Sequence, residues 1–205
     1  MVDTVILMYF LMAAQEDLLV EVLGRPIGVP RVVYDPDEGD APESSRSEMS
    51  RSLAYYRAAA ADLSADASMR DQAAANAKRL HVIDDLCNGE KLVVMDMTAE
   101  EQAVFGATTS PTGCGTYGLM FPLSAGEAAC LAIAVHRGVT LVTDDGDALR
   151  ALKHVNPAHP YQRIRKLLIK ANTDALISRQ KANDIHRTMT RLGFWDTTLP
   201  YPDEP

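Results

Sequence analysis

Carboxylate side chains stand at several points of the chain where a strand or a helix is expected to begin or end. Asp3 lies in a short apolar run, Asp35 follows another, Glu127 opens an apolar helix, and Asp145 and Asp147 follow an apolar strand. Carboxylates gathered in one cleft repel one another unless a divalent cation neutralises them. Such hard oxygen ligands suit Mg²⁺ or Mn²⁺, which can activate water and stabilise the charge that develops during phosphodiester cleavage.

The helices and strands expected around these residues alternate in the order that is typical of an α/β fold. Hydrophobic patterns, caps and glycines predict strands at 2–7, 27–30, 91–97 and 139–143 and helices at 9–23, 48–63, 68–87, from 148, 163–170 and 178–192. They predict loops at 35–47 and 106–118, and capping boxes at 98–101 and 124–127. Sites in parallel sheets form beyond the carboxyl ends of strands, so we expect Asp3 and Asp145 to lie close together.

Some of these acids also have ordinary structural roles open to them. Glu127 is the third helical residue of a capping box that Ser124 begins, and it can hold the Ser124 amide. One acid of the Asp144–Asp147 turn is expected to cap the next helix, and we assign that cap to Asp147. Asp3 is harder to explain structurally, because a lone carboxylate in an apolar strand is costly to bury.

The net charge of −8 speaks against a general nucleic-acid coat, but the charge is unevenly distributed. Residues 1–162 hold 12 basic and 23 acidic side chains, whereas residues 163–191 hold 8 basic and 2 acidic ones. The basic segment has three interpretations, namely a solvated helix face, a contact for RNA phosphates, or a docking surface for a second copy, which would make a homodimer.

Several other classes of protein are disfavoured. The three cysteines, Cys87, Cys114 and Cys130, form neither a disulfide framework nor a zinc motif, and the histidines show no metal-binding spacing. The apolar run Val5–Ala14 is too short to cross a bilayer, and no signal peptide is recognised, so we expect a cytoplasmic protein without membrane contact.

Read together, the order and spacing of the acidic motifs resemble the PIN-domain ribonucleases, of the kind found as VapC-type toxins in toxin–antitoxin pairs. Asp3-Thr-Val-Ile-Leu7 is similar to the opening strand of that family, and the stretch 127–147 is similar to its paired acidic element, with Glu127 and Asp145 separated by 18 residues. Further similarity lies at Gly24, at 29–30 and 33–34, and in the tail from LLIKANTDALIS to LGFW.

The resemblance implies a metal-dependent endoribonuclease in which Asp3, Glu127 and Asp145 bind Mg²⁺ or Mn²⁺. It implies RNA as substrate and an antitoxin protein as partner, with Asp147 as a further, more variable acid. The second acid of the family falls at Pro36, which cannot coordinate a metal. Asp35 is therefore our candidate for the fourth acid, and the other possibilities for that role are Asp37, Glu38 and Glu48.

The sequence thus predicts an α/β protein with a PIN-like parallel sheet flanked by helices. We expect a nuclease domain over 1–156 and a basic, helical C-terminal extension over 157–205 that packs on it. The proline at the second acidic position leaves an alternative open, a catalytically silent PIN-like module that binds RNA or protein. A phosphorylated receiver domain is a weaker third interpretation, because its acidic pair would follow the first strand.

Overall fold

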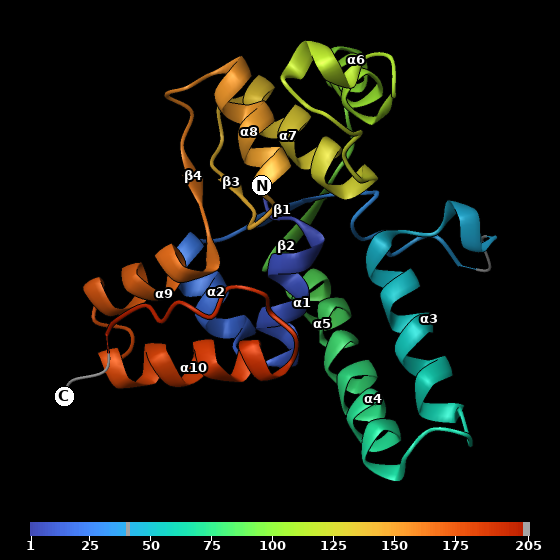
Figure 1. Cartoon of the computed structure of the whole chain (residues 1–205), viewed down its shortest axis with the longest axis vertical. Helices are drawn as coiled ribbons and strands as arrows, with labels where there is room; N and C mark the ends of the chain where they lie inside the picture. The colour runs from blue at the N-terminus through green and yellow to red at the C-terminus, as the bar shows by residue number, and fades with distance from the viewer. Residues whose placement is uncertain (40–41, 203–205) are drawn as a thin grey trace.

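A computed structural model describes residues 1–39 and 42–202 and shows a mixed α/β fold in which helices surround short parallel strands (Figure 1). The helices are α1 (Thr4–Met12), α2 (Glu16–Leu23), α3 (Glu48–Ala61), α4 (Ala67–Leu80), α5 (Val82–Asn88), α6 (Ala99–Thr109), α7 (Ala125–Arg137), α8 (Gly146–Val155), α9 (Ile164–Thr173) and α10 (Arg179–Arg191). Short 3₁₀ turns cover Glu43–Ser45 and Cys114–Tyr117. The strands are β1 (Ile27–Pro30), β2 (Leu92–Met95), β3 (Leu141–Val142) and β4 (Tyr161–Gln162).

The strands form two parallel pairs that the N-terminus joins. β1 pairs with β2, and β3 pairs with β4. Between the pairs, the Val2 amide donates to the Gly28 carbonyl at 3.0 Å, and the Val142 amide donates to the Met1 carbonyl at 2.8 Å. The prediction of an α/β fold with parallel strands is confirmed at this level. β1 has its predicted bounds, and the strands predicted at 91–97 and 139–143 are shorter than predicted.

The predicted strand at 2–7 is wrong. Val2 makes an isolated parallel bridge to Val142, and the chain then turns at Asp3 into α1. A continuous apolar run is consistent with either a buried strand or a buried helix, and here the Asp3 side chain caps the helix and decides between them. The predicted helix at 9–23 is correspondingly two helices, separated at Ala14, whose φ is +54°.

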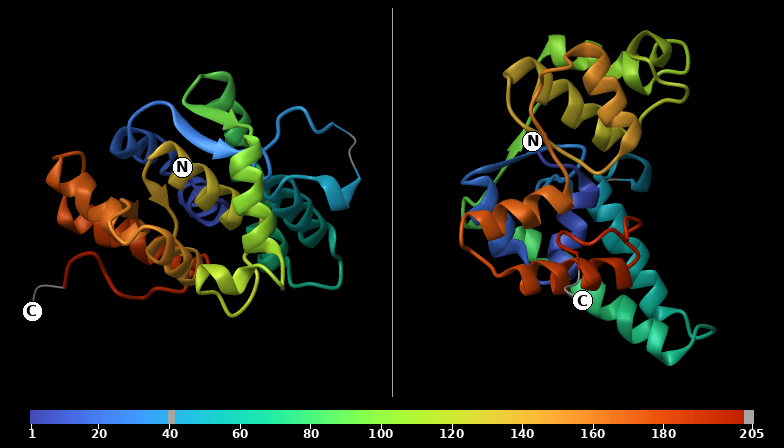
Figure 2. Two further views of the ribbon diagram at one scale, coloured as in Figure 1. Left: turned by 90° about the horizontal axis from the view of Figure 1, so that it is seen from above. Right: turned by 60° about the vertical axis from the view of Figure 1, so that its left-hand side comes forward.

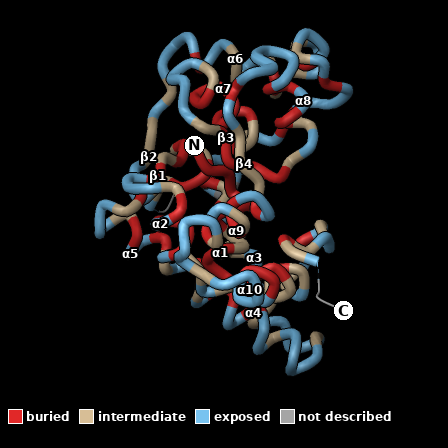
Figure 3. Tube along the Cα trace, turned by 90° about the vertical axis from the view of Figure 1, so that its left-hand side faces the viewer, coloured by how far each residue is buried: buried red, intermediate tan, exposed pale blue. Residues whose placement is uncertain are grey.

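The core is formed around α7, which strands β1 and β3 and helices α6 and α8 contact. Every residue from Ala128 to Ala134 is fully buried, and most of these side chains are small, so neighbouring backbones can approach closely. Ser124 begins α7 through the predicted capping box, and Gly138 ends it with a left-handed φ of +65°. Figure 3 shows this buried layer at the level of the strands.

Helices α3 and α4 form a hairpin that extends away from the strands (Figures 1 and 2). The helix predicted at 48–63 is confirmed, and the one predicted at 68–87 divides at His81 into α4 and α5. The N-terminal half of α3 lies beside α1, so the hairpin supplies one wall of a pocket described below. The loop predicted at 106–118 is partly wrong, because α6 continues to Thr109.

The segment after residue 156 packs closely on the rest of the chain. β4 adds to β3, α9 contacts α2, and Phe194 packs on Tyr9 with ring centroids 5.2 Å apart. The proposed boundary at 156/157 stays a prediction, and the end of the predicted extension, 203–205, lies outside the described residues. Among the described residues, no helix has the length and apolar character needed to cross a membrane.

Candidate active site

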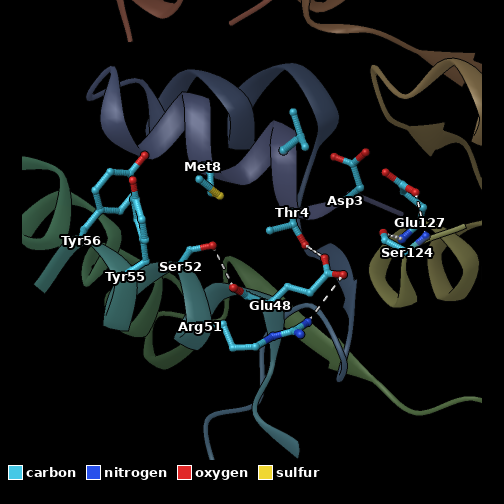
Figure 4. Close-up of a pocket in the computed structure, with 11 residues that line it drawn as sticks. Asp3, Thr4, Met8, Glu48, Arg51, Ser52, Tyr55, Tyr56, Ser124 and Glu127 are labelled. Carbon is cyan, nitrogen blue, oxygen red and sulfur yellow. Dashed lines mark hydrogen bonds and ion pairs between the residues drawn. The ribbon is translucent and has the colours of Figure 1, made fainter. Parts of the chain in front are cut away.

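A pocket of about 530 Å³ opens between α1, α3 and the start of α7 (Figure 4). Asp3, Thr4 and Met8 line it from the first helix, Glu48 from α3, and Glu127 from α7. The acids therefore reach one place from three separate segments of the chain. Of the candidate acids named from the sequence, Asp3, Glu48 and Glu127 line this pocket, and Asp145 does not.

Asp3 lies where the chain leaves the Val2 bridge and enters α1. One carboxylate oxygen, Oδ1, accepts a hydrogen bond from the Ile6 amide at 2.9 Å and caps the helix. The other, Oδ2, accepts from the hydroxyl of Thr143, which follows β3. The Asp145 amide donates in turn to the Thr143 hydroxyl oxygen at 3.0 Å, so Thr143 links Asp3 to the Asp145 backbone.

Burial is the main reason that the pKa of Asp3 is raised to about 7. The hydrogen bonds from Thr143 and Ile6 oppose this shift, while the charges of Glu127 and Asp144 add to it. The residue is 2% exposed, so its charged form loses most of its hydration. A cation beside Asp3 would stabilise its charged form and offset the lost hydration.

Glu127 makes the predicted capping box and lines the pocket as well. Its Oε2 accepts from the Ser124 amide at 3.0 Å, and its own amide donates to the Ser124 hydroxyl at 3.4 Å. Burial raises the pKa of Glu127, and the negative charges of Asp145 and Glu48 raise it further. Capping and a role in the pocket are thus compatible in this residue.

Asp145 caps α8, and Asp147 does not. The Asp145 Oδ1 accepts from the Ala148 amide at 2.6 Å, because α8 begins at Gly146 rather than at Ala148. The assignment of the cap to Asp147 is therefore wrong. Asp147 lies in the first turn of α8, forms an ion pair with Arg150, and does not line the pocket.

Asp144 has a separate structural role on the far side of the same turn. It is buried and accepts from the Ile164 amide at 2.8 Å and from Arg163 at 3.1 Å. These bonds tie the end of β3 to the start of α9.

The structure does not bring Asp35 to this pocket. Its Oδ1 lies 2.7 Å from Arg31 Nη1 and accepts from the Asp37 amide at 3.0 Å. Arg31 also forms an ion pair with Asp96, the residue that follows β2, with Nε and Oδ1 2.6 Å apart. Asp35 lines a different pocket, together with Glu38.

Glu48, one of the four candidates for the fourth acid, lines the pocket. As the first residue of α3 it points toward α1 and α7, where its Oε1 accepts from the Gly126 amide at 2.9 Å and its Oε2 accepts from the Thr4 hydroxyl. A side chain at Gly126 would overlap the Glu48 carboxylate, so the glycine makes room for it. Sequence counting could not select Glu48 among the four candidates, since the loop before α3 carries it to the site.

The chemistry of this donor set fits a divalent cation, because every donor is a carboxylate oxygen. Among the described residues, however, no group of three or more His, Cys, Asp or Glu side chains is arranged to hold a metal ion. Asp3 and Glu48 each use both oxygens, and Glu127 uses one, in the hydrogen bonds given above. Coordination of one ion by all three would require these side chains to turn toward one another.

Several side chains of the basic segment are engaged in contacts within the molecule, and Arg163 also pairs with Asp144, as given above. Arg163 lies over the ring of Trp195 at 5.5 Å, Lys166 lies over Tyr161 at 4.2 Å, and Lys170 pairs with Asp174. These contacts favour the interpretation of a solvated helix face, and the contact of Arg163 with Trp195 also holds the C-terminal tail.

Comparisons were made with protein-family models, with curated proteins and with solved structures, and none of the three found a match.

Proposed function

We propose that this protein is a divalent-cation-dependent endoribonuclease with a PIN-like fold, acting as the toxin of a toxin–antitoxin pair. The observation that carries the proposal is the gathering of Asp3, Glu48 and Glu127 in one pocket, with Asp145 near enough to raise the pKa of Glu127. Buried acids that raise one another's pKa values are typical of functional sites. The parallel strands and the position of Asp3 and Asp145 beyond their carboxyl ends support the same proposal.

In this proposal Asp3, Glu48, Glu127 and Asp145 would hold Mg²⁺ or Mn²⁺. When bound, such a cation neutralises the acids, lowers the pKa of water and stabilises the charge of a phosphodiester under attack. Thr143 orients Asp3 through its hydroxyl, and Ser124 orients Glu127 through its amide. Asp35 and Asp147 are left out, because both are paired with arginine away from the pocket.

The biological setting is part of the same proposal. The acidic charge of residues 1–162 suits a basic antitoxin partner, and a reducing cytoplasm suits the three free cysteines.

Cleavage of a labelled single-stranded RNA, with Mn²⁺ and with EDTA, tests the proposal. We expect cleavage by the wild type in Mn²⁺ and its loss in EDTA. We also expect its loss in Glu127→Gln and Asp145→Asn, two changes that keep the helix caps. The control is Asp85→Asn, a change of the same charge at an exposed acid of α5. Equal cleavage by every variant in both buffers would refute the proposal.

The absence of a ready three-acid metal set among the described residues favours a second candidate, a silent PIN-like module that binds RNA or protein. Calorimetric titration with Mn²⁺ separates the two. Binding that Glu127→Gln weakens supports the nuclease, and no binding at millimolar Mn²⁺ supports the module.

A further inference from the structure

The pocket continues from the acids along α3 to an aromatic end (Figure 4). Glu48, Arg51, Ser52 and Tyr55 stand at positions i, i+3, i+4 and i+7 and so share one face of α3. The opposing floor comes from α1, where Val5 and Met8 are apolar. One pocket therefore contains the acids at one end, the basic side chain of Arg51, and the exposed ring of Tyr55.

Arg51 is placed to bind an anion in this pocket. Its side chain is 46% exposed, and Nη2 lies 3.9 Å from Glu48 Oε1, a long ion pair. No hydrogen bond joins its guanidinium to the described residues. A guanidinium with uncommitted N–H groups is well suited to a phosphate, which it can bind through two parallel hydrogen bonds.

Tyr55 presents an aromatic surface at the far end of the pocket. The residue is 67% exposed, and its ring packs edge-on against Tyr56 with centroids 5.3 Å apart. The edge contact steadies the ring and leaves its exposed surface available for stacking. Every nucleobase has a flat face that can stack on such a ring, whatever its sequence.

We propose that Arg51 and Tyr55 form a binding subsite for single-stranded RNA, in which Arg51 contacts a phosphate and Tyr55 stacks on a neighbouring base. The inference rests on the proposed function, because the acids mark where the scissile phosphate would lie. Tyr55 lies seven positions after Glu48, which is about 10 Å along the helix axis. The subsite therefore lies beside the acids and holds the strand as it passes them.

The chemistry favours a single strand over a duplex. In a duplex the base faces are stacked on one another, so Tyr55 would have no face to meet. A positive group next to an aromatic one is the usual combination in proteins that bind unpaired nucleic acid without sequence preference.

Fluorescence anisotropy with a labelled single-stranded RNA tests the subsite separately from cleavage. The buffer contains Ca²⁺, which binds hard oxygen ligands and screens the acids, and gel analysis verifies that the RNA stays intact. We expect Tyr55→Ala to weaken binding about tenfold and Tyr55→Phe to leave it nearly unchanged, because the ring is retained. Arg51→Gln should lower the slope of log affinity against log salt concentration by about 0.7, the value for one phosphate contact on a single strand.

Matched controls lie elsewhere on the surface. Phe121 is also 67% exposed but does not line the pocket, so Phe121→Ala should bind RNA as the wild type does. Arg57 is on α3 but outside the pocket, and Arg57→Gln should leave the salt slope unchanged. An RNA duplex should bind more weakly than the single strand and should not respond to Tyr55→Ala.

The two proposals fail in different ways. If the wild type binds RNA, Tyr55→Ala weakens that binding and no variant cleaves in Mn²⁺, the subsite stands and the nuclease proposal fails. If the wild type cleaves RNA but Tyr55→Ala and Arg51→Gln bind it normally, the subsite is refuted. An absence of RNA binding by the wild type also refutes it.

Discussion

The hydroxyl of Thr143, at the end of β3, donates a hydrogen bond to the buried carboxylate of Asp3, which begins α1. The same hydroxyl oxygen accepts from the Asp145 amide. One side chain thus fixes the relative positions of two acids that lie 142 residues apart in the sequence. Asp3 and Asp145 follow neighbouring parallel segments of the chain, so the same contact that holds these segments together also positions the two acids.

Replacing Thr143 with valine should destabilise the protein. Valine has a similar shape but leaves the Asp3 carboxylate and the Asp145 amide without their partner, at a cost of about 1–3 kcal/mol. Thr143→Ser keeps the hydroxyl and should recover most of this loss. Urea denaturation at pH 7 measures both variants. If the two variants unfold at the same urea concentration, the hydroxyl has no role in stability.

Asp3→Asn should stabilise the protein at alkaline pH in the absence of metal. The pKa of Asp3 is about 7 in the folded protein and 3.8 for an ordinary aspartate, so the folded protein holds the proton more tightly than the unfolded chain does. The contribution of this group is fully present below pH 3.8 and is lost as the pH rises through 7. By pH 8 the free energy of unfolding is lower by on the order of 4 kcal/mol for this reason. The neutral amide of asparagine does not titrate and avoids this loss.

The measurement is urea denaturation of wild type and Asp3→Asn at pH 5 and pH 8 in EDTA. The advantage of the variant should be larger at pH 8. Addition of Mn²⁺ at pH 8 should stabilise the wild type alone, since ligand binding to the folded state adds to stability. If the variant is no more stable than the wild type at pH 8, the pKa of the Asp3 carboxylate is not raised by burial.

Glu48→Gln should reduce RNA cleavage about 100-fold, and Asp35→Asn should leave it nearly unchanged. The glutamine keeps an oxygen for the Gly126 amide but removes the charge, so the local fold is retained. Cleavage rates at saturating Mn²⁺ measure both. The opposite result, a large effect at Asp35 and a small one at Glu48, would assign the fourth acid to Asp35 and overturn the geometry proposed for the pocket.

The parts of the fold that could be predicted from sequence are those with local signals. The capping boxes at Thr98 and Ser124 and the glycine at 138 define α6 and α7 through contacts between near neighbours. The first helix could not be told from a strand, because a run in which nearly every residue is apolar shows neither the helical nor the strand period. Its state depends on the cap that Asp3 provides and on the contact with β3.

The candidate site divides in the same way. Glu127 and Asp145 belong to one continuous unit of helix, strand and helix, so their spacing in sequence already relates them in space. Glu48 could not be selected, because a long polar loop separates it from β1 and the sequence does not determine against which elements the helix that it begins will pack. Asp35 lies nearer in sequence but is held by Arg31, a pairing that no local pattern indicates.

Acid should destabilise the protein through His186, and His186→Leu should weaken that effect. The ring of His186 is fully buried against Phe194, and neither of its nitrogens has a hydrogen-bond partner among the described residues. Burial lowers its pKa below 6.5, and the nearby charge of Asp196 partly opposes the shift while that of Arg165 adds to it. The unfolded chain therefore takes up a proton that the folded protein does not, and the contribution of His186 to stability falls as the pH drops below about 6.5. Leucine removes the titration and the unpaired nitrogens, so it should raise stability at pH 7.5 by about 1 kcal/mol and more at pH 5.

Urea denaturation of both proteins between pH 5 and pH 8 measures the difference, with His154→Leu, a change at an exposed histidine of α8, as the control. If wild type and His186→Leu lose stability in parallel as the pH falls, His186 is not the group responsible.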